Sequence, residues 1–203
     1  MKKLTAFLLC LLMMTSALAE KLNIPFYDKE LLSEAAKASG ICEEILEEHD
    51  EKPTRSLLFS LVTGMQSHMA AGNFYMDMPL NHKIFLAQFD AIRRIAEEGP
   101  CVIVGRCADY VLRENPDAVS VFVKADMASK VDRAVKYYGI EADKAEDRIR
   151  KADKQRASYY NYYATATWGD VDNYDLVVDT GVLGVEGAVE LIAKFLELRA
   201  EKK

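Results

Sequence analysis

Apolar side chains in the middle of the chain recur at steps of three and four residues, which places them on one face of a helix. This spacing predicts a helix over residues 80–98, ended by Gly99 and Pro100. A second helix is expected over residues 127–138, with Gly139 as its stop. Weaker patterns predict further helices, over residues 29–39, 43–50, 55–70, about 143–163 and 185–199, with a loop from the third of these to Pro79.

Three short apolar runs without helical spacing predict strands that are buried on both faces. They cover residues 101–104, 119–123 and 175–178, and an extended piece precedes them at 23–28, where Pro25 disfavours a helix. Strands of this kind, alternating with helices, predict an α/β fold with a parallel sheet covered by helices. Ligands of such sheets bind at the carboxyl ends of the strands, so the residues after each run are the candidates for chemistry.

The start of the chain has the pattern of a secretory leader. Two lysines precede an apolar run over residues 4–14, and an Ala-x-Ala pattern follows. We therefore expect a signal-peptide-like leader over residues 1–19, cleaved before Glu20, and one domain over 20–203. Two alternatives stay open: a first β-strand of a cytosolic fold, or an uncleaved anchor, although the run is shorter than the roughly 20 apolar residues that span a membrane.

Composition and charge restrict the classes of function. Half of the 203 residues are hydrophobic and 29% are charged, which is typical of a soluble globular domain and not of a disordered or disulfide-rich chain. The net charge of −6 argues against binding nucleic acid or an anionic membrane through bulk charge, so an anion site requires a local group of cations. The four cysteines have neither metal-site nor disulfide spacing. That favours the cytoplasm, whereas the leader favours export, so the location stays open.

One cation follows the first buried strand directly. Gly105 permits a tight turn there, and Arg106 comes next. Its guanidinium group can donate two parallel hydrogen bonds to a phosphate, or it can pair with the nearby Asp109. Arg133 lies on the helix over residues 127–138, where a basic side chain is more typical of a solvated face than of an anion site.

The long charged helix holds the densest group of cations. Asp153 lies three residues from both Arg150 and Arg156, so it can hold both guanidinium groups through (i, i+3) pairs on one helical face. One interpretation is a surface ladder of ion pairs, which adds little stability. The other is a lid over about residues 133–170 that closes over a transferring phosphoryl group and excludes water. An aromatic group follows, which we expect to pack at the base of the lid, although a surface for stacking a base ring is the alternative: Tyr159, Tyr160, Tyr162, Tyr163 and Trp168.

Six segments together resemble one known family. They are residues 18–31, 49–54, 99–109, 153–163, 168–170 and 174–180. In this order and spacing, and over about nine tenths of the chain, they resemble the cytidylate kinase-like family of P-loop proteins.

The resemblance implies a nucleoside monophosphate kinase fold with a helical lid. Such enzymes use Mg²⁺ and move the γ-phosphoryl group of ATP to a nucleotide such as CMP or dCMP. It implies substrate-binding roles for Asp28, Arg106 and Asp109, and catalytic roles in the lid for Arg133, Arg150, Asp153 and Arg156.

The chain departs from this family at its start, where the family has a strand and a glycine-rich phosphate loop. The first glycine here is Gly40, and no GxxxxGK[ST] motif precedes Leu22. A phosphate loop needs successive backbone N–H groups aimed at the phosphate, which the apolar run does not supply. We therefore expect the first strand and the loop to be replaced, and little phosphoryl transfer. Three alternatives stay open: residues 4–9 form the strand, the protein is a non-catalytic nucleotide- or anion-binding module, or it is an exported protein.

Overall fold

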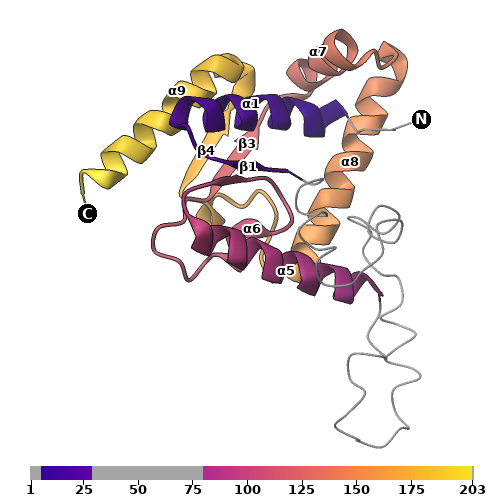
Figure 1. Cartoon of the computed structure of the whole chain (residues 1–203). Coiled ribbons are helices and arrows are strands. Elements are labelled where there is room, and N and C mark those ends of the chain that lie inside the picture. The colour runs from indigo at the N-terminus through magenta and orange to yellow at the C-terminus, as the bar shows by residue number, and fades with distance from the viewer. Residues whose placement is uncertain (1–5, 29–79, 203) are drawn as a thin grey trace, which may run out of the picture.

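The computed structural model describes residues 6–28 and 80–202 (Figure 1). The helices expected over residues 29–39, 43–50 and 55–70, with the loop that follows them, lie outside the described residues. The described elements, in chain order, are α1 (Ala6–Leu22), β1 (Phe26–Tyr27), α5 (Leu80–Glu98), β2 (Val102–Ile103), α6 (Ala108–Val111), β3 (Val121–Lys124), α7 (Met127–Tyr138), α8 (Ala142–Tyr163), a 3-10 turn (Val171–Asn173), β4 (Leu176–Asp179) and α9 (Thr180–Ala200).

The described strands form two parallel pairs, which confirms the predicted α/β class. β1 pairs with β2, where Tyr27 lies opposite Ile103, and β3 pairs with β4, where Lys124 lies opposite Asp179. The chain returns from the end of one strand to the start of its parallel neighbour through helices, as parallel pairing requires. Val102 of β2 packs against the same apolar cluster as the side chains of β3 and β4, so both pairs share one core.

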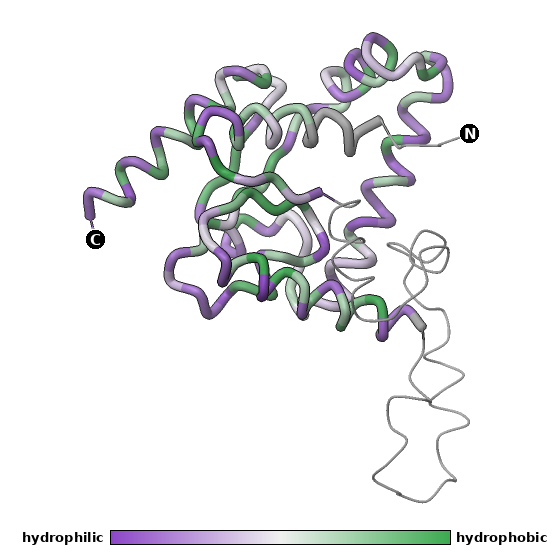
Figure 2. Tube along the Cα trace, in the orientation of Figure 1, coloured by the Kyte–Doolittle hydropathy of each residue, from purple (hydrophilic) through white to green (hydrophobic). Residues whose placement is uncertain are grey.

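Helices cover the strands on two faces, with α1 and α9 on one and α5 with α6 on the other (Figure 1). Val102 packs toward α1 and α9, and its neighbour Ile103 packs toward α5, because successive side chains of a strand point to opposite faces. Figure 2 shows the hydrophobic positions concentrated on the strands and on the faces of the helices near them, whereas α8 is largely hydrophilic. The buried residues of the α1–α9 core are Met14, Leu18, Val178, Ala188, Val189, Ile192 and Ala193.

The start of the chain is a helix. α1 runs over Ala6–Leu22, so the two alternatives that made the apolar run a strand are wrong from residue 6 onward. The physical reason is composition: Leu, Met and Ala dominate this stretch, and Thr15 is its only β-branched residue. Among the described residues no helix is both long and apolar enough to cross a membrane. Cleavage before Glu20 stays a prediction, and it would remove Met14 and Leu18 from the core.

Replacing Leu18 tests whether α1 belongs to this core. We expect Leu18→Ala to lower the free energy of unfolding by about 2–3 kcal/mol. The buried Leu18 side chain packs in the α1–α9 core, and its removal leaves a cavity there. Urea unfolding of the full chain measures the change. The control Met13→Ala alters an exposed side chain of the same helix, five residues earlier, and should change stability by less than about 0.5 kcal/mol. Equal losses for both variants would contradict the packing of α1.

Candidate functional site

The carboxyl ends of the parallel strands bring together side chains that are far apart in sequence. Asp28 follows β1, and Arg106 follows β2 after a short turn. The backbone N–H of Val104 donates to the carbonyl oxygen of Tyr27 at 3.0 Å, which fixes the ends of these two strands beside each other. Asp28 and Arg106 therefore follow the ends of neighbouring strands, at the edge of the sheet where a ligand is predicted to bind.

The turn that carries Arg106 has an unusual backbone. Gly105, Arg106 and Cys107 have φ values of 74°, 56° and 56°, so three successive residues are left-handed. Only the glycine adopts this conformation without strain, and each of the other two costs about 1–3 kcal/mol. The Arg106 side chain is nevertheless buried, with the residue 5% exposed. Strain of this kind persists only where the surroundings impose it, and it gathers at functional sites.

Asp109 has a different partner from the one considered from the sequence. Its Oδ2 atom accepts a hydrogen bond from the hydroxyl of Tyr160 at 2.5 Å. Tyr160 lies in the last turns of α8 and is buried. Burial, and then the Asp109 carboxylate, raise the pKa of Tyr160 far above its usual value, so the phenol stays a donor. This bond joins the segment after β2 to the base of the charged helix.

Arg133 reaches from α7 to the ends of β3 and β4. Its Nη1 atom donates to Oγ1 of Thr180 at 3.0 Å, and its Nε atom donates to the carbonyl oxygen of Ser129. The hydroxyl of the buried Thr180 donates in turn to the carbonyl oxygen of Lys124, the last residue of β3. The guanidinium group is therefore fixed at the carboxyl edge of the second strand pair.

Asp153 joins α7 and α8 through two cations. It accepts from Nζ of Lys130 at 2.7 Å and from Nη1 of Arg156 at 3.1 Å. The three side chains are 14% (Lys130), 19% (Asp153) and 13% (Arg156) exposed, which is far less than a surface ladder would show. The spacing of Asp153 and Arg156 predicts their ion pair correctly. Lys130 was missed as a partner, because no spacing within one helix reports a contact between two helices.

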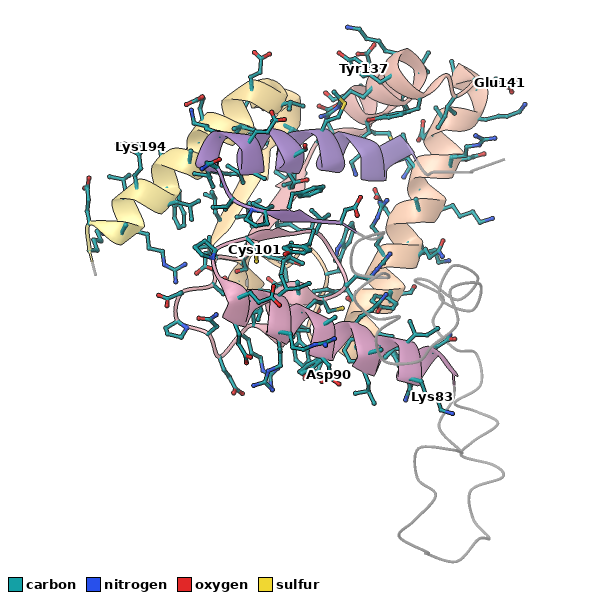
Figure 3. All side chains as sticks on the ribbon, in the orientation of Figure 1. Lys83, Asp90, Cys101, Tyr137, Glu141 and Lys194 are labelled. Carbon is teal, nitrogen blue, oxygen red and sulfur yellow. The ribbon has the colours of Figure 1, made fainter. Side chains whose placement is uncertain are left out.

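Arg150 does not join this group. Its guanidinium pairs with Glu146 one turn earlier, and its side chain is 64% exposed, so the expected Arg150–Asp153 pair is wrong. Residues four apart are neighbours on the same side of a helix, so Glu146 competes with Asp153 for the Arg150 guanidinium group. Figure 3 shows the far end of the α7–α8 hairpin, marked by Tyr137 and Glu141, projecting away from the strands.

The aromatic group at the base of α8 packs inside the protein, as the sequence predicts. Tyr159 and Tyr160 form one cluster with Cys107, and the ring of Tyr163 stacks on Phe85 of α5 with centroids 4.1 Å apart. His82 and Tyr162 share a hydrogen bond of 2.8 Å. Within the ranges 6–28 and 80–202, no group of three or more His, Cys, Asp or Glu side chains has the arrangement of a metal site.

This packing predicts the response to alkaline pH. Burial raises the pKa values of Tyr160, Tyr162, Tyr163 and Tyr174. The folded protein keeps these phenolic protons, whereas the unfolded chain releases them above pH about 10, so stability is full below that pH and falls as the pH rises. Absorbance at 295 nm should show part of the ten tyrosines ionising only when the protein unfolds. Ionisation of all ten near pH 10 in the folded protein would contradict the packing.

Comparison with known sequences gives three findings. The model of a family described as the cytidylate kinase-like family matches residues 13–182. The chain is similar to the cytidylate kinase of Methanopyrus kandleri, with 26% identity over 136 residues, covering 56% of this chain and 70% of that protein. It is also similar to the cytidylate kinase of Methanococcus vannielii, with 25% identity over 162 residues, covering 71% and 92%.

A solved structure is similar over almost the whole chain. It is the crystal structure of an uncharacterized protein from Eubacterium ventriosum, with 34% sequence identity and a TM-score of 0.67. The match covers 91% of this chain and 90% of that one. The overall arrangement of helices and strands therefore recurs in an experimental structure.

Proposed function

This chain belongs to the cytidylate kinase-like family, and we propose that it binds a nucleoside monophosphate such as CMP at the carboxyl edge of its strands. The observation that carries the proposal is the buried, left-handed position of Arg106 at the end of β2, beside the end of the strand that leads to Asp28. The likeness to cytidylate kinases supports the same substrate class.

Two residues have the chemistry that the acceptor nucleotide requires. The Arg106 guanidinium would donate two hydrogen bonds to the phosphate, which is the fork geometry that arginine offers and lysine does not. Asp28, as a carboxylate, only accepts hydrogen bonds, so it would take them from hydroxyl or amino groups of the nucleotide. Positive charge on the phosphate side and an acceptor on the other side would fix the orientation of the bound nucleotide.

The cations of α7 and α8 would form the lid. Arg133 is held at the ends of β3 and β4, and Arg156 is oriented by Asp153, so both guanidinium groups are placed in advance. Phosphoryl transfer depends mainly on positioning and on neutralising the charge of the transferred group, and fixed guanidinium groups do both. Arg150 would have to leave Glu146 to take part, and its exposure leaves it room to do so.

The described residues fit binding of the nucleotide that accepts the phosphoryl group better than binding of ATP, the phosphoryl donor. ATP would supply the phosphoryl group, and Mg²⁺ would neutralise its phosphates. Residues 6–22 form α1, and no residue ahead of Leu22 is a glycine, so this stretch does not fit the cradle of backbone N–H groups that holds ATP phosphates.

An assay of the purified chain tests the two sides separately. Calorimetry with CMP should give a dissociation constant below about 1 mM, and absence of binding at millimolar CMP would reject the proposed acceptor site. In the presence of ATP, Mg²⁺ and CMP, we expect ADP formation far below the roughly 1–100 per second typical of kinases. Turnover in that range would show that our account of the donor side is wrong.

A further inference from the structure

Tyr160 lies near the end of α8, and its hydroxyl contacts Asp109, just after the left-handed loop of residues 105–107 that carries Arg106. We propose that Tyr160 is a positioning residue, which holds the loop of Arg106 in its binding conformation through Asp109. The proposal rests on the proposed function, since it gives Arg106 the acceptor phosphate as its ligand. In this proposal Asp109 supports the loop that carries Arg106. The Asp109–Tyr160 bond then links the acceptor site to the last turn of α8.

The loop needs support from outside itself. Arg106 and Cys107 are both left-handed, and neither is a glycine. The helix that follows, α6, has only four residues. Its N-cap residue is Cys107, whose side chain makes no capping hydrogen bond to the first turn. A single helical turn is not stable in isolation, so tertiary contacts must hold it.

Tyr160 makes the contacts that this loop requires. Its hydroxyl donates to Oδ2 of Asp109, in the first turn of α6, at 2.5 Å. Its side chain belongs to the same buried cluster as Cys107. Asp109 is half-buried, and a carboxylate in that setting is stabilised when a strong donor reaches it. The bond therefore fixes the loop immediately after the arginine.

Two neighbouring tyrosines on α8 differ from Tyr160 in the contacts that their hydroxyl groups make. Tyr159 is buried to the same extent as Tyr160, and its hydroxyl reaches Oε1 of Gln88 only at 3.5 Å. The hydroxyl of Tyr163 is buried and has no hydrogen-bond partner within the part of the chain that the structure describes. The short bond to Asp109 distinguishes Tyr160 from both, and Tyr159→Phe is a matched control for Tyr160→Phe.

Hydrogen–deuterium exchange of the full chain tests the loop without any ligand. The amide groups of Ala108, Val111 and Leu112 donate to backbone oxygens within residues 105–108, so their exchange reports the order of this segment. We expect exchange there to become about tenfold faster in Tyr160→Phe and to stay unchanged in Tyr159→Phe. Equal exchange in Tyr160→Phe and the wild type would overturn the proposal.

Calorimetry with CMP tests the consequence for binding. Tyr160→Phe and Asp109→Ala should each weaken CMP binding about fivefold to tenfold, and the double variant should bind no more weakly than the worse single one. Tyr159→Phe should bind CMP like the wild type. Unchanged CMP affinity in Tyr160→Phe, or additive losses in the double variant, would overturn the proposal. If the wild type itself fails to bind CMP, the proposed function fails, and exchange of residues 105–112 alone decides whether Tyr160 orders the loop.

Discussion

Arg106→Ala should weaken CMP binding by about a hundredfold, because a charged donor of two hydrogen bonds to the phosphate is lost. Arg106→Lys should recover only part of this loss, since an ammonium group keeps the charge but not the fork. Calorimetry of both variants measures the effect, and urea unfolding shows whether each one folds. Arg113→Ala is the control, because that side chain is exposed and lies over the ring of Tyr110.

The same affinity for CMP in Arg106→Ala and in Arg113→Ala would remove Arg106 from the acceptor site. A loss confined to Arg106, in variants that remain folded, would support the direct contact that we propose. The lysine variant separates charge from geometry: full recovery would mean that charge alone is required.

Asp153→Ala should lower the free energy of unfolding by about 4 kcal/mol, because two largely buried cations share its carboxylate. Lys130 is on α7 and Arg156 is on α8, so the loss falls on the contact between the two helices. The matched control is Glu146→Ala, which breaks an exposed pair with Arg150 on the same helix and should cost about 0.5 kcal/mol or less.

Urea unfolding of both variants measures this difference. Similar small losses would place Asp153 in an ordinary surface network, whereas the large loss identifies it as the centre of the α7–α8 contact. The variant Lys130→Met distinguishes the contributions of the two cations, because it removes the inter-helix pair and leaves the Asp153–Arg156 pair in place.

Much of the fold could be predicted where local spacing and stop signals agree. α5 and α7 begin and end at the predicted residues, because the apolar faces are regular, and Gly139 adopts the left-handed conformation expected at a helix end. α9 begins at Thr180, five residues earlier than predicted, because Asp179 caps it and the chain continues through a kink at Gly184. Helical spacing reports only the part that follows the kink.

The site was predictable along one helix and not between elements. The Asp153–Arg156 pair follows from a three-residue step, whereas Lys130 contacts Asp153 across two helices. Tyr160 and Asp109 are 51 residues apart, and nothing in the composition of either segment indicates their bond. The helical conformation of residues 6–22 was obscured because an apolar run that resembles a leader has no periodicity of its own.

The most direct measurement of the central claim compares CMP with cytidine on two proteins. If Arg106 binds the phosphate, the wild type should bind CMP at least about thirtyfold more tightly than cytidine, which lacks it. In Arg106→Ala the two ligands should bind with nearly equal affinity. The same ratio of CMP to cytidine affinity in both proteins would contradict the account, because the phosphate would then be recognised elsewhere.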